Sequence, residues 1–242
     1  MIKNYINKII ASQKFTPTFL GMFFNPFWFA RRNLFYNIKL YGKKLSGKIL
    51  DIGCGSKPYK SYLNGSYVGL EVADKNVNNK NLDSEILFFD GKDFPLESNS
   101  IDSILCTQVL EHVENPNFFF SEIKRVLKKD GLLLLTVPFV WAEHDIPYDF
   151  NRFTVFGLKK LIMENEFDVI EYKKIGNNFS IIGQLINSYL YDILPNKIKY
   201  NIITHIFLYG FFNLSFYLLS KILPKNDNLY LDNVILAKFK KN

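Results

Sequence analysis

The feature that most constrains the fold of this chain is a glycine-rich turn that directly follows a short apolar run. Residues 48–52 are mainly aliphatic and predict a buried strand. Gly53 and Gly55 come next, and Ser56 and Pro58 then suit the cap and the first turn of a helix. Such a loop lets the backbone approach a ligand closely and offers it N–H donors. The stretch 48–59 therefore predicts a nucleotide-binding unit.

An acidic residue stands at the distance that such a unit requires. Glu71 ends the next apolar run, 67–70, and lies twenty residues after Asp51. At this offset in nucleotide-binding βαβ folds, an acid receives the hydroxyl pair of a ribose. A dinucleotide fingerprint would need another glycine after Gly55, and residues 56–58 contain none. Because Asp51 adjoins the turn, a cationic ligand is favoured over a pyrophosphate.

Length and cysteine content set further limits. The 242 residues suit one α/β domain with an additional segment. Cys54 and Cys106 do not make a disulfide framework, which favours a reduced, cytoplasmic compartment. We expect no secretory signal, because Lys3, Lys8 and Lys14 interrupt the apolar residues at the N-terminus.

The formal net charge of +7 is distributed unevenly. Residues 1–48 contain nine Lys and Arg and no acidic residue, residues 49–176 have a net charge of −6, and residues 177–242 have a net charge of +4. The basic ends are rich in aromatic residues and lack the dense Lys and Arg stripe that tracks phosphates. We therefore expect no nucleic-acid partner. An anionic membrane surface fits better, with a solvated basic surface as the alternative.

Alternating strand and helix patterns predict an α/β fold with a mainly parallel sheet. The expected strands are residues 48–53, 66–71, 86–90, 101–106, 131–137, 167–175 and 233–239. Helices are expected at 31–41 and 118–129, and a further helix begins after its capping residue Thr154.

The composition also predicts how these elements are grouped. Residues 1–47 form an aromatic and basic helical cap, which includes an amphipathic helix at 1–14 and an aromatic segment at 15–29 that either lies in a membrane interface or covers the core. Residues 48–176 form the ligand-binding core. Residues 177–226 are a hydrophobic helical insertion, because fifty residues are more than a hairpin connection needs. Residues 227–242 return the last strand to the core.

The insertion contains an apolar stretch, 202–223, in which only His205 and Lys221 are ionisable. Twenty-two residues are enough to span a bilayer. A single crossing is excluded, because the chain must return to a strand of the cytoplasmic sheet. A pair of in-plane or re-entrant helices, including 181–194, is the favoured arrangement. The alternatives are a helical subdomain over the active site and a homodimer interface.

The pattern Asp-x-Gly-x-Gly at 51–55 resembles motif I of the class I S-adenosylmethionine (SAM)-dependent methyltransferases. The resemblance implies a Rossmann-like sheet of seven strands with the last antiparallel, and SAM as the cofactor. Lys57 departs from the family pattern, which commonly has a third glycine there. The motif and the acid after it imply cofactor contacts from Asp51, Gly53, Cys54, Gly55 and Glu71.

Two further strand ends extend the resemblance. Asp90 and Gly91 resemble the acidic turn whose carboxylate takes the adenine amino group and whose following N–H faces the ring. Thr107 and Gln108 would lie beside the methionine part of the cofactor, at the sheet edge where open α/β folds bind ligands. The pair at 111–112, Glu-His, is common at this place in the family, and its histidine is expected to be structural rather than catalytic.

The stretch 137–154 resembles a methyltransferase subgroup found with bacterial surface-polysaccharide genes. His144 could remove a proton from a substrate hydroxyl near neutral pH. Asp145 or Asp149 could orient its imidazole. Arg152 could hold an acidic substrate group, and Tyr148 could stack on a sugar, so Tyr148, Asp149 and Arg152 are the candidate acceptor-binding residues. The structural alternative is that Arg152 pairs with an aspartate and braces the loop.

We place no metal in this loop, because His144, Asp145 and Asp149 are close in sequence and adjacent ligands rarely converge on one ion. The sequence therefore predicts a cytoplasmic SAM-dependent methyltransferase that acts on a glycan or a lipid-linked glycan precursor at the inner face of the membrane. One rival acceptor is an apolar small molecule such as a quinone or a polyketide. A rival from another class is a non-catalytic SAM-binding membrane adaptor.

Overall fold

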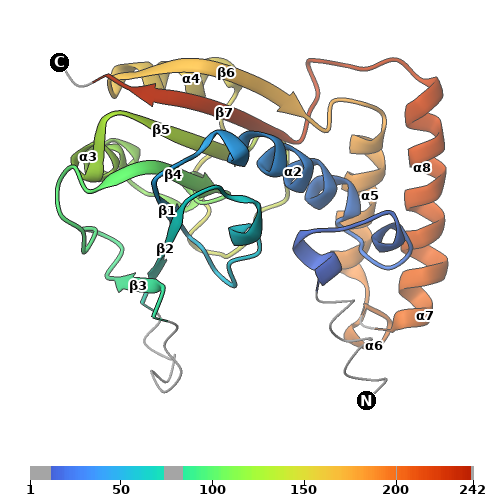
Figure 1. Ribbon diagram of the computed structural model, residues 1–242. Helices are drawn as coiled ribbons and strands as arrows, with labels where there is room; N and C mark the ends of the chain where they lie inside the picture. The colour runs from blue at the N-terminus through green and yellow to red at the C-terminus, as the bar shows by residue number, and fades with distance from the viewer. Residues whose placement is uncertain (1–11, 74–83, 200, 241–242) are drawn as a thin grey trace. The chain divides into compact units, whose positions relative to one another are not determined.

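The computed structural model describes residues 12–73, 84–199 and 201–240, and the helix expected at 1–14 lies almost wholly outside them. A single mixed sheet runs through the structure in the order β3-β2-β1-β4-β5-β7-β6 (Figure 1). Its strands are β1 (Lys48–Ile52), β2 (Ser66–Val72), β3 (Ile86–Phe89), β4 (Ile101–Thr107), β5 (Leu127–Pro138), β6 (Phe167–Ile175) and β7 (Asp232–Phe239). The β7 strand is antiparallel, which confirms the methyltransferase-type fold expected from the sequence.

The register of the central strands brings several chain segments to one edge of the sheet. β1 pairs in parallel with β2 and with β4, so that Ile52 lies beside Leu70 on one side and beside Cys106 on the other. Parallel strands end at the same edge, where their connecting loops meet. The residues after β1, β2 and β4 therefore share one region of the molecule.

Helices connect or flank the strands. The α-helices are α2 (Trp28–Tyr41), α3 (Pro116–Val126), α4 (Val155–Glu164), α5 (Ser180–Ile193), α6 (Asn196–Lys199), α7 (Ile202–Thr204) and α8 (Gly210–Ile222). Short 3-10 segments are η1 (Leu20–Phe23), η2 (Gly42–Lys44), η3 (Lys60–Tyr62) and η5 (Leu110–His112), and η6 (His205–Tyr209) is a π-helical turn. Thr154 caps α4 as expected, accepting a hydrogen bond from the Gly157 N–H at 3.1 Å.

Three expected boundaries are wrong, each for a local reason. No α-helix begins at Ser56 and Pro58, because the connection 53–65 contains Lys57 at φ +57° and only the short η3. The helix expected at 118–129 begins at Pro116, since the Asn115 side chain caps it by accepting from the Phe118 N–H. It ends at Val126 because the next residues already pair with β4 at the start of β5.

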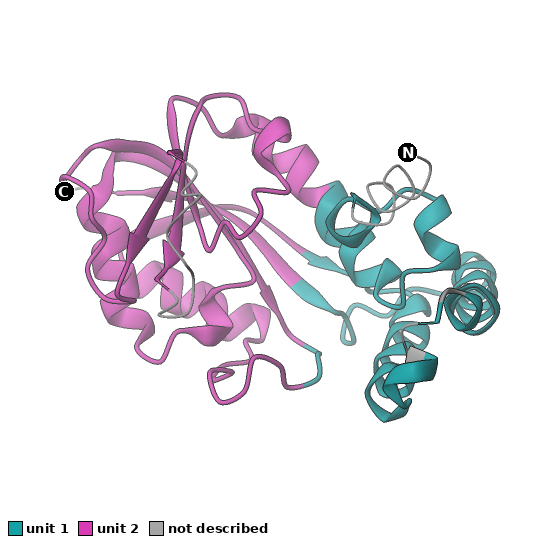
Figure 2. Ribbon diagram, turned by 90° about the horizontal axis from the view of Figure 1, so that it is seen from below, with its two compact units in different colours: residues 1–36, 140–142, 174–232 teal, residues 37–139, 143–173, 233–242 magenta. Residues whose placement is uncertain are grey.

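The chain forms two compact units (Figure 2). The sheet unit comprises residues 37–139, 143–173 and 233–242, and the helical unit comprises residues 1–36, 140–142 and 174–232. The core of the sheet unit is aliphatic and aromatic. It packs the sheet against α3 and α4 through fully buried residues such as Leu50, Ile104, Phe120, Leu135 and Leu158.

The long helices α5 and α8 of the helical unit bury amide side chains. Asn213 of α8 is fully buried, donates to the backbone carbonyls of Met22 (2.8 Å) and Asn25 (3.1 Å), and accepts from the Asn187 amide of α5 (2.8 Å). Gln184 of α5 is also fully buried and bridges backbone groups of the N-terminal segment. These amides satisfy each other and the backbone, so the polar faces of both helices are used for packing.

Large apolar side chains are exposed along α7, η6 and α8. Phe207, Phe211 and Ile222 are 75 %, 65 % and 81 % exposed, and Ile203, Leu214 and Leu218 continue the stripe. In α8 a buried Asn213 beside the exposed Phe211 and Leu214 is the reverse of the usual pattern of a surface helix. No helix in the described ranges combines the length and the apolar character that a membrane crossing requires.

Candidate functional site

The glycine turn after β1 is shaped by close packing on one side and open space on the other. Gly53 has φ +67°, and a Cβ there would lie 2.3 Å from Cγ2 of Val109. Gly55 has φ +48°, and no atom lies within 4 Å of the place where its Cβ would be. Lys57 adopts a positive φ as well and donates to Glu85 at 2.9 Å. The turn therefore keeps a left-handed backbone without a third glycine, and it leaves room for a ligand over Gly55.

Asp51 lies at the centre of a buried polar cluster behind this turn. Its Oδ2 accepts a hydrogen bond from the Tyr67 hydroxyl at 2.7 Å, and the carboxyl is almost completely buried. Burial raises the pKa of Asp51 to about 7, against the lowering effect of the Tyr67 bond, and the nearby Glu71 raises it further. Burial and the same two carboxylates raise the pKa of the Cys54 thiol to about 12, so Cys54 remains a thiol.

The pKa of Asp51 makes the stability of the protein dependent on pH. The unfolded carboxyl ionises at pH 3.8 and the folded one at about 7, so stability falls as the pH rises between these values. At pH 8 the folded protein bears the full free-energy cost of ionising the buried Asp51 carboxyl. We expect Asp51→Asn to raise the free energy of unfolding at pH 8 by about 2–4 kcal/mol and to have little effect at pH 4. Urea unfolding at both pH values measures this.

Asp102→Asn is a control for which the expected change in stability at pH 8 has the opposite sign. Hydrogen bonds from Lys128 and from the Lys48 N–H lower the pKa of Asp102, so Asp102→Asn is expected to destabilise the protein at pH 8. Equal destabilisation by Asp51→Asn at pH 8 and at pH 4 would contradict the raised pKa of Asp51, because the carboxyl would then be ionised in the folded state at both pH values.

Glu71 faces the glycine turn from the end of β2. Its Oε2 accepts a hydrogen bond from the Gly55 N–H at 2.7 Å, and its charge acts on both Asp51 and Cys54. The structure thus brings together Asp51, Cys54, Gly55 and Glu71, all of which were predicted as cofactor contacts.

Asp90 and Gly91 occupy a separate turn after β3. The Asp90 carboxylate accepts from the Lys92 N–H at 2.9 Å, and Gly91 has φ +87°. Both residues are exposed. Within the described parts of the chain, Asp90 has no hydrogen bond to the cluster around Asp51.

The residues after β4 present an unused polar atom. The Thr107 hydroxyl is buried and has no hydrogen-bond partner among the described residues. Gln108 follows with φ +55°, and its amide donates to the Thr136 hydroxyl at 3.3 Å. A buried hydroxyl without a partner is costly unless a ligand or water satisfies it. A nucleoside ligand with hydroxyl and amino groups fits this region, which offers open space over Gly55, the Glu71 carboxylate and the Thr107 hydroxyl.

An ion pair stabilises the loop after β5. The buried carboxylate of Asp149 receives both terminal nitrogens of Arg152, with 2.6 Å between Nη2 and Oδ2. The Arg152 bonds lower the pKa of Asp149 to about 2 against the effect of burial, so Asp149 remains ionised throughout the neutral range. This ion pair is the contact that the structural alternative for Arg152 requires, and acceptor binding by Arg152 stays a prediction.

His144 lies against this ion pair. Its backbone N–H donates to Oδ2 of Asp149 at 3.0 Å, and its Nδ1 lies 3.3 Å from the same oxygen. Asp149, rather than Asp145, therefore orients the His144 imidazole. The exposed Asp145 approaches His112 instead, with 3.8 Å between its Oδ2 and Nε2 of that ring. Tyr148 is exposed, as an acceptor-binding side chain would be.

Sequence reasoning assigned only a structural role to His112 and none to Glu111. The His112 and His144 rings meet edge to face with 4.7 Å between centroids, and the Glu111 carboxylate is fully buried beside them. The Glu111 carbonyl accepts from the N–H groups of Phe150 and Asn151, which fixes the loop against η5. The Glu-His pair was visible in the sequence, but its neighbour His144 is 32 residues away.

Comparison with known proteins agrees with this geometry. The family described as a methyltransferase domain matches residues 50–135. An uncharacterized protein of Methanocaldococcus jannaschii is 27% identical over 168 residues, which cover 67% of this chain and 71% of that protein. A ubiquinone biosynthesis O-methyltransferase of Pelagibacter ubique is 30% identical over 101 residues, which cover 36% of this chain and 40% of that enzyme.

A solved structure supports the fold. Phosphoethanolamine N-methyltransferase 2 of Haemonchus contortus, in complex with SAM, has a TM-score of 0.54 and 17% identity, with 95% of this chain and 59% of that chain covered. At this identity the likeness concerns the fold, whereas the matched domain covers the strands that carry the glycine turn, Glu71 and Thr107. The match over residues 50–135 and the fold together support a methyltransferase that uses S-adenosylmethionine as its cofactor.

Proposed function

We propose that this enzyme methylates a hydroxyl group of a lipid-borne acceptor at the cytoplasmic face of the membrane, and that a glycan or lipid-linked glycan precursor is the first acceptor to test. The observation that carries the membrane part is the set of large apolar side chains that the helical unit exposes, such as Phe207, Phe211 and Ile222, while α5 and α8 bury amide side chains. The match to a methyltransferase domain favours an enzyme over a non-catalytic adaptor.

In this proposal the ends of β1 to β4 hold the cofactor. Glu71 accepts hydrogen bonds from the ribose hydroxyls, and the backbone of the glycine turn lies beneath the cofactor. The positive charge of the cofactor favours the ionised form of Asp51. Thr107 gains the hydrogen-bond partner that its buried hydroxyl requires. The assigned cofactor residues are Asp51, Gly53, Cys54, Gly55, Glu71, Asp90, Gly91, Thr107 and Gln108.

The loop after β5 handles the acceptor. SAM supplies a methyl group on a cationic sulfur: the bond between carbon and sulfur breaks as the bond to the acceptor oxygen forms, and the electron pair stays on sulfur. His144 promotes the loss of the hydroxyl proton, Asp149 and Arg152 hold the imidazole in place, and the exposed Tyr148 contacts the acceptor. The exposed Asp145 carboxylate lies beside the His112 imidazole.

The charge of the helical unit supports contact with an anionic lipid surface. Its sequence contains ten Lys and Arg and three Asp. Basic residues beside aromatic ones suit the headgroup region of a membrane. The apolar stripe would then enter the boundary between headgroups and acyl chains.

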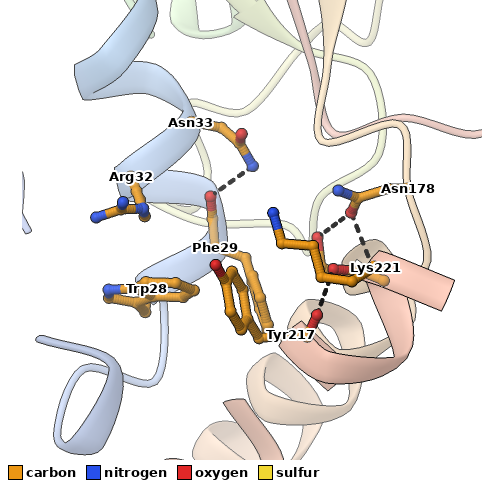
Figure 3. A pocket seen from close by; sticks show the side chains of 9 residues that line it. Trp28, Phe29, Arg32, Asn33, Asn178, Tyr217 and Lys221 are labelled. Atoms are coloured by element: carbon orange, nitrogen blue, oxygen red, sulfur yellow. Dashed lines mark hydrogen bonds between the residues drawn. The ribbon is translucent and has the colours of Figure 1, made fainter. Parts of the chain in front are cut away.

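A small pocket in the helical unit is lined by basic side chains beside aromatic ones (Figure 3). Its volume is about 170 Å³, and it lies between α2 and the C-terminal end of α8. Lys221 lies over the Tyr217 ring at 5.0 Å, and Arg32 lies over the Trp28 ring at 5.1 Å. Two cations on aromatic rings at a pocket rim suit the phosphate of a lipid headgroup.

Vesicle flotation tests the membrane part. We expect the full chain to float with vesicles that contain phosphatidylglycerol, and a Phe207→Asp/Phe211→Asp variant to lose at least about tenfold in binding, because each charge would enter an apolar layer. The matched control is Phe156→Asp, which changes an exposed phenylalanine of α4 in the sheet unit. Equal flotation of both variants would contradict the proposal. The proposal would also be contradicted if light scattering showed that the Phe207→Asp/Phe211→Asp variant loses a homodimer while its flotation is unchanged.

A second acceptor class is favoured by a separate observation. Two matching relatives are ubiquinone biosynthesis O-methyltransferases, at 30% identity over 101 and 112 residues. An apolar ring with a hydroxyl group is also lipid-borne. A turnover screen with labelled SAM against sugar nucleotides, lipid-linked sugars and hydroxylated quinones separates the two classes. Methylation of water-soluble sugar nucleotides alone would contradict the lipid-borne acceptor.

A further inference from the structure

Three side chains with metal-binding atoms converge beside the proposed acceptor site. Glu111, His112 and His144 each present one ligand atom, and these atoms lie within 4.8 Å of one another. Two of the residues follow β4 and the third follows β5, so parallel pairing of these strands brings the group together. A tetrahedral Zn²⁺ with bonds of about 2.1 Å separates its ligand atoms by about 3.4 Å. The group would need to contract by little more than an ångström.

Both imidazoles already have the partners that orient metal-bound histidines. Nδ1 of His112 lies 2.7 Å from the backbone carbonyl oxygen of Tyr148. Nδ1 of His144 lies 3.3 Å from the carboxylate of Asp149, which is itself fixed by Arg152. A metal-bound histidine typically donates its other ring N–H to a carbonyl or a carboxylate, which fixes the tautomer and the ring direction. In both rings this arrangement directs Nε2 to the metal.

The surrounding charges suit a cation. The Glu111 carboxylate is fully buried, and Asp145 lies 3.8 Å from Nε2 of His112 on the exposed side. Arg152, whose two terminal nitrogens bond to Asp149, also interacts electrostatically with Glu111. A divalent ion would offset the negative charge of Glu111 at a place where water has little access.

We propose that Glu111, His112 and His144 bind a divalent first-row transition metal, such as Zn²⁺. Two imidazoles with a carboxylate favour such ions over Mg²⁺ and Ca²⁺, which prefer oxygen ligands alone. The three ligands leave a coordination position for an exogenous oxygen atom.

The role of the metal rests on the proposed methyl transfer to a hydroxyl group. A metal that holds the acceptor oxygen favours release of its proton to solvent, so that the oxygen carries the electron pair that forms the bond to the methyl carbon. His144 then promotes proton loss as a ligand of the metal rather than as the proton acceptor. Acceptors with two adjacent hydroxyl groups, in sugars or in catechols, would bind with both oxygens.

Metal binding can be measured without cofactor or acceptor. Titration of the tag-free full chain with Co²⁺, followed by its visible absorption, is expected to show one site per chain, and Zn²⁺ is expected to abolish the band. Glu111→Gln and His112→Ala are each expected to weaken binding by at least about tenfold. His205→Ala is the matched control, because this third histidine lies in the helical unit, with Nδ1 2.6 Å from the Phe24 carbonyl oxygen, and should leave the titration unchanged.

The outcomes are distinct. Absence of a Co²⁺ band in the wild-type chain, or a band that survives in both variants while their circular dichroism shows them folded, would overturn the metal site. A metal site with no methylation of any hydroxyl acceptor would overturn the proposed function and leave the metal site intact. Loss of methyl transfer on chelation, restored by Zn²⁺, would support both.

Discussion

Glu71→Ala is expected to weaken the binding of S-adenosylhomocysteine by about 100-fold. The carboxylate would lose two hydrogen bonds from the ribose hydroxyls, and a hydrogen bond to a charged group contributes about 1.5 kcal/mol or more. The variant also loses the acceptor for the Gly55 N–H, which holds the glycine turn. Isothermal titration calorimetry with the full chain measures the change.

Two further variants separate these contributions. Glu71→Gln keeps an oxygen for the Gly55 N–H, so it is expected to bind more tightly than the alanine variant and more weakly than the wild type. Glu164→Ala removes an exposed acid of α4 that has only a 3.8 Å ion pair with Lys160, and it should bind normally. Unchanged affinity in Glu71→Ala would remove the proposed ribose contact and, with it, the placement of the cofactor at the end of β2.

His144→Ala is expected to reduce turnover by about 10²- to 10⁴-fold while the affinity for S-adenosylhomocysteine changes less than about twofold. A group that assists proton transfer contributes an effect of this size. The expectation holds whether His144 accepts the proton or acts through a metal, because both routes use its imidazole. Turnover on the acceptor found in the screen, together with calorimetry, measures the two quantities separately.

The neighbours of His144 provide the comparison. Asp149→Asn keeps the shape of the side chain but removes the charge that receives Arg152, and it is expected to lower turnover in the same direction as His144→Ala. His205→Ala, in the helical unit, should retain full turnover. Normal turnover in His144→Ala would show that the loop after β5 has a structural role only.

Local sequence patterns predicted the sheet because each strand depends mainly on its own residues. The apolar runs at 48–53 and 66–71, for example, became β1 and β2 with changes of one residue, and 167–175 became β6 without change. The glycine turn was also predictable, since Gly53 and Gly55 both have positive φ. The helix expected after it was wrong, because a cap and a proline do not show that Lys57 adopts a left-handed conformation.

The sequence by itself determined the strands, the glycine turn and the acid at the end of β2, since hydrophobic periodicity and backbone preference are local properties. Only the tertiary structure decided which face of α5 and α8 is exposed, because Asn213 and Gln184 are buried by partners far away in the chain. It also decided that Glu111, His112 and His144 meet, because parallel pairing of β4 with β5 joins loops that the sequence separates.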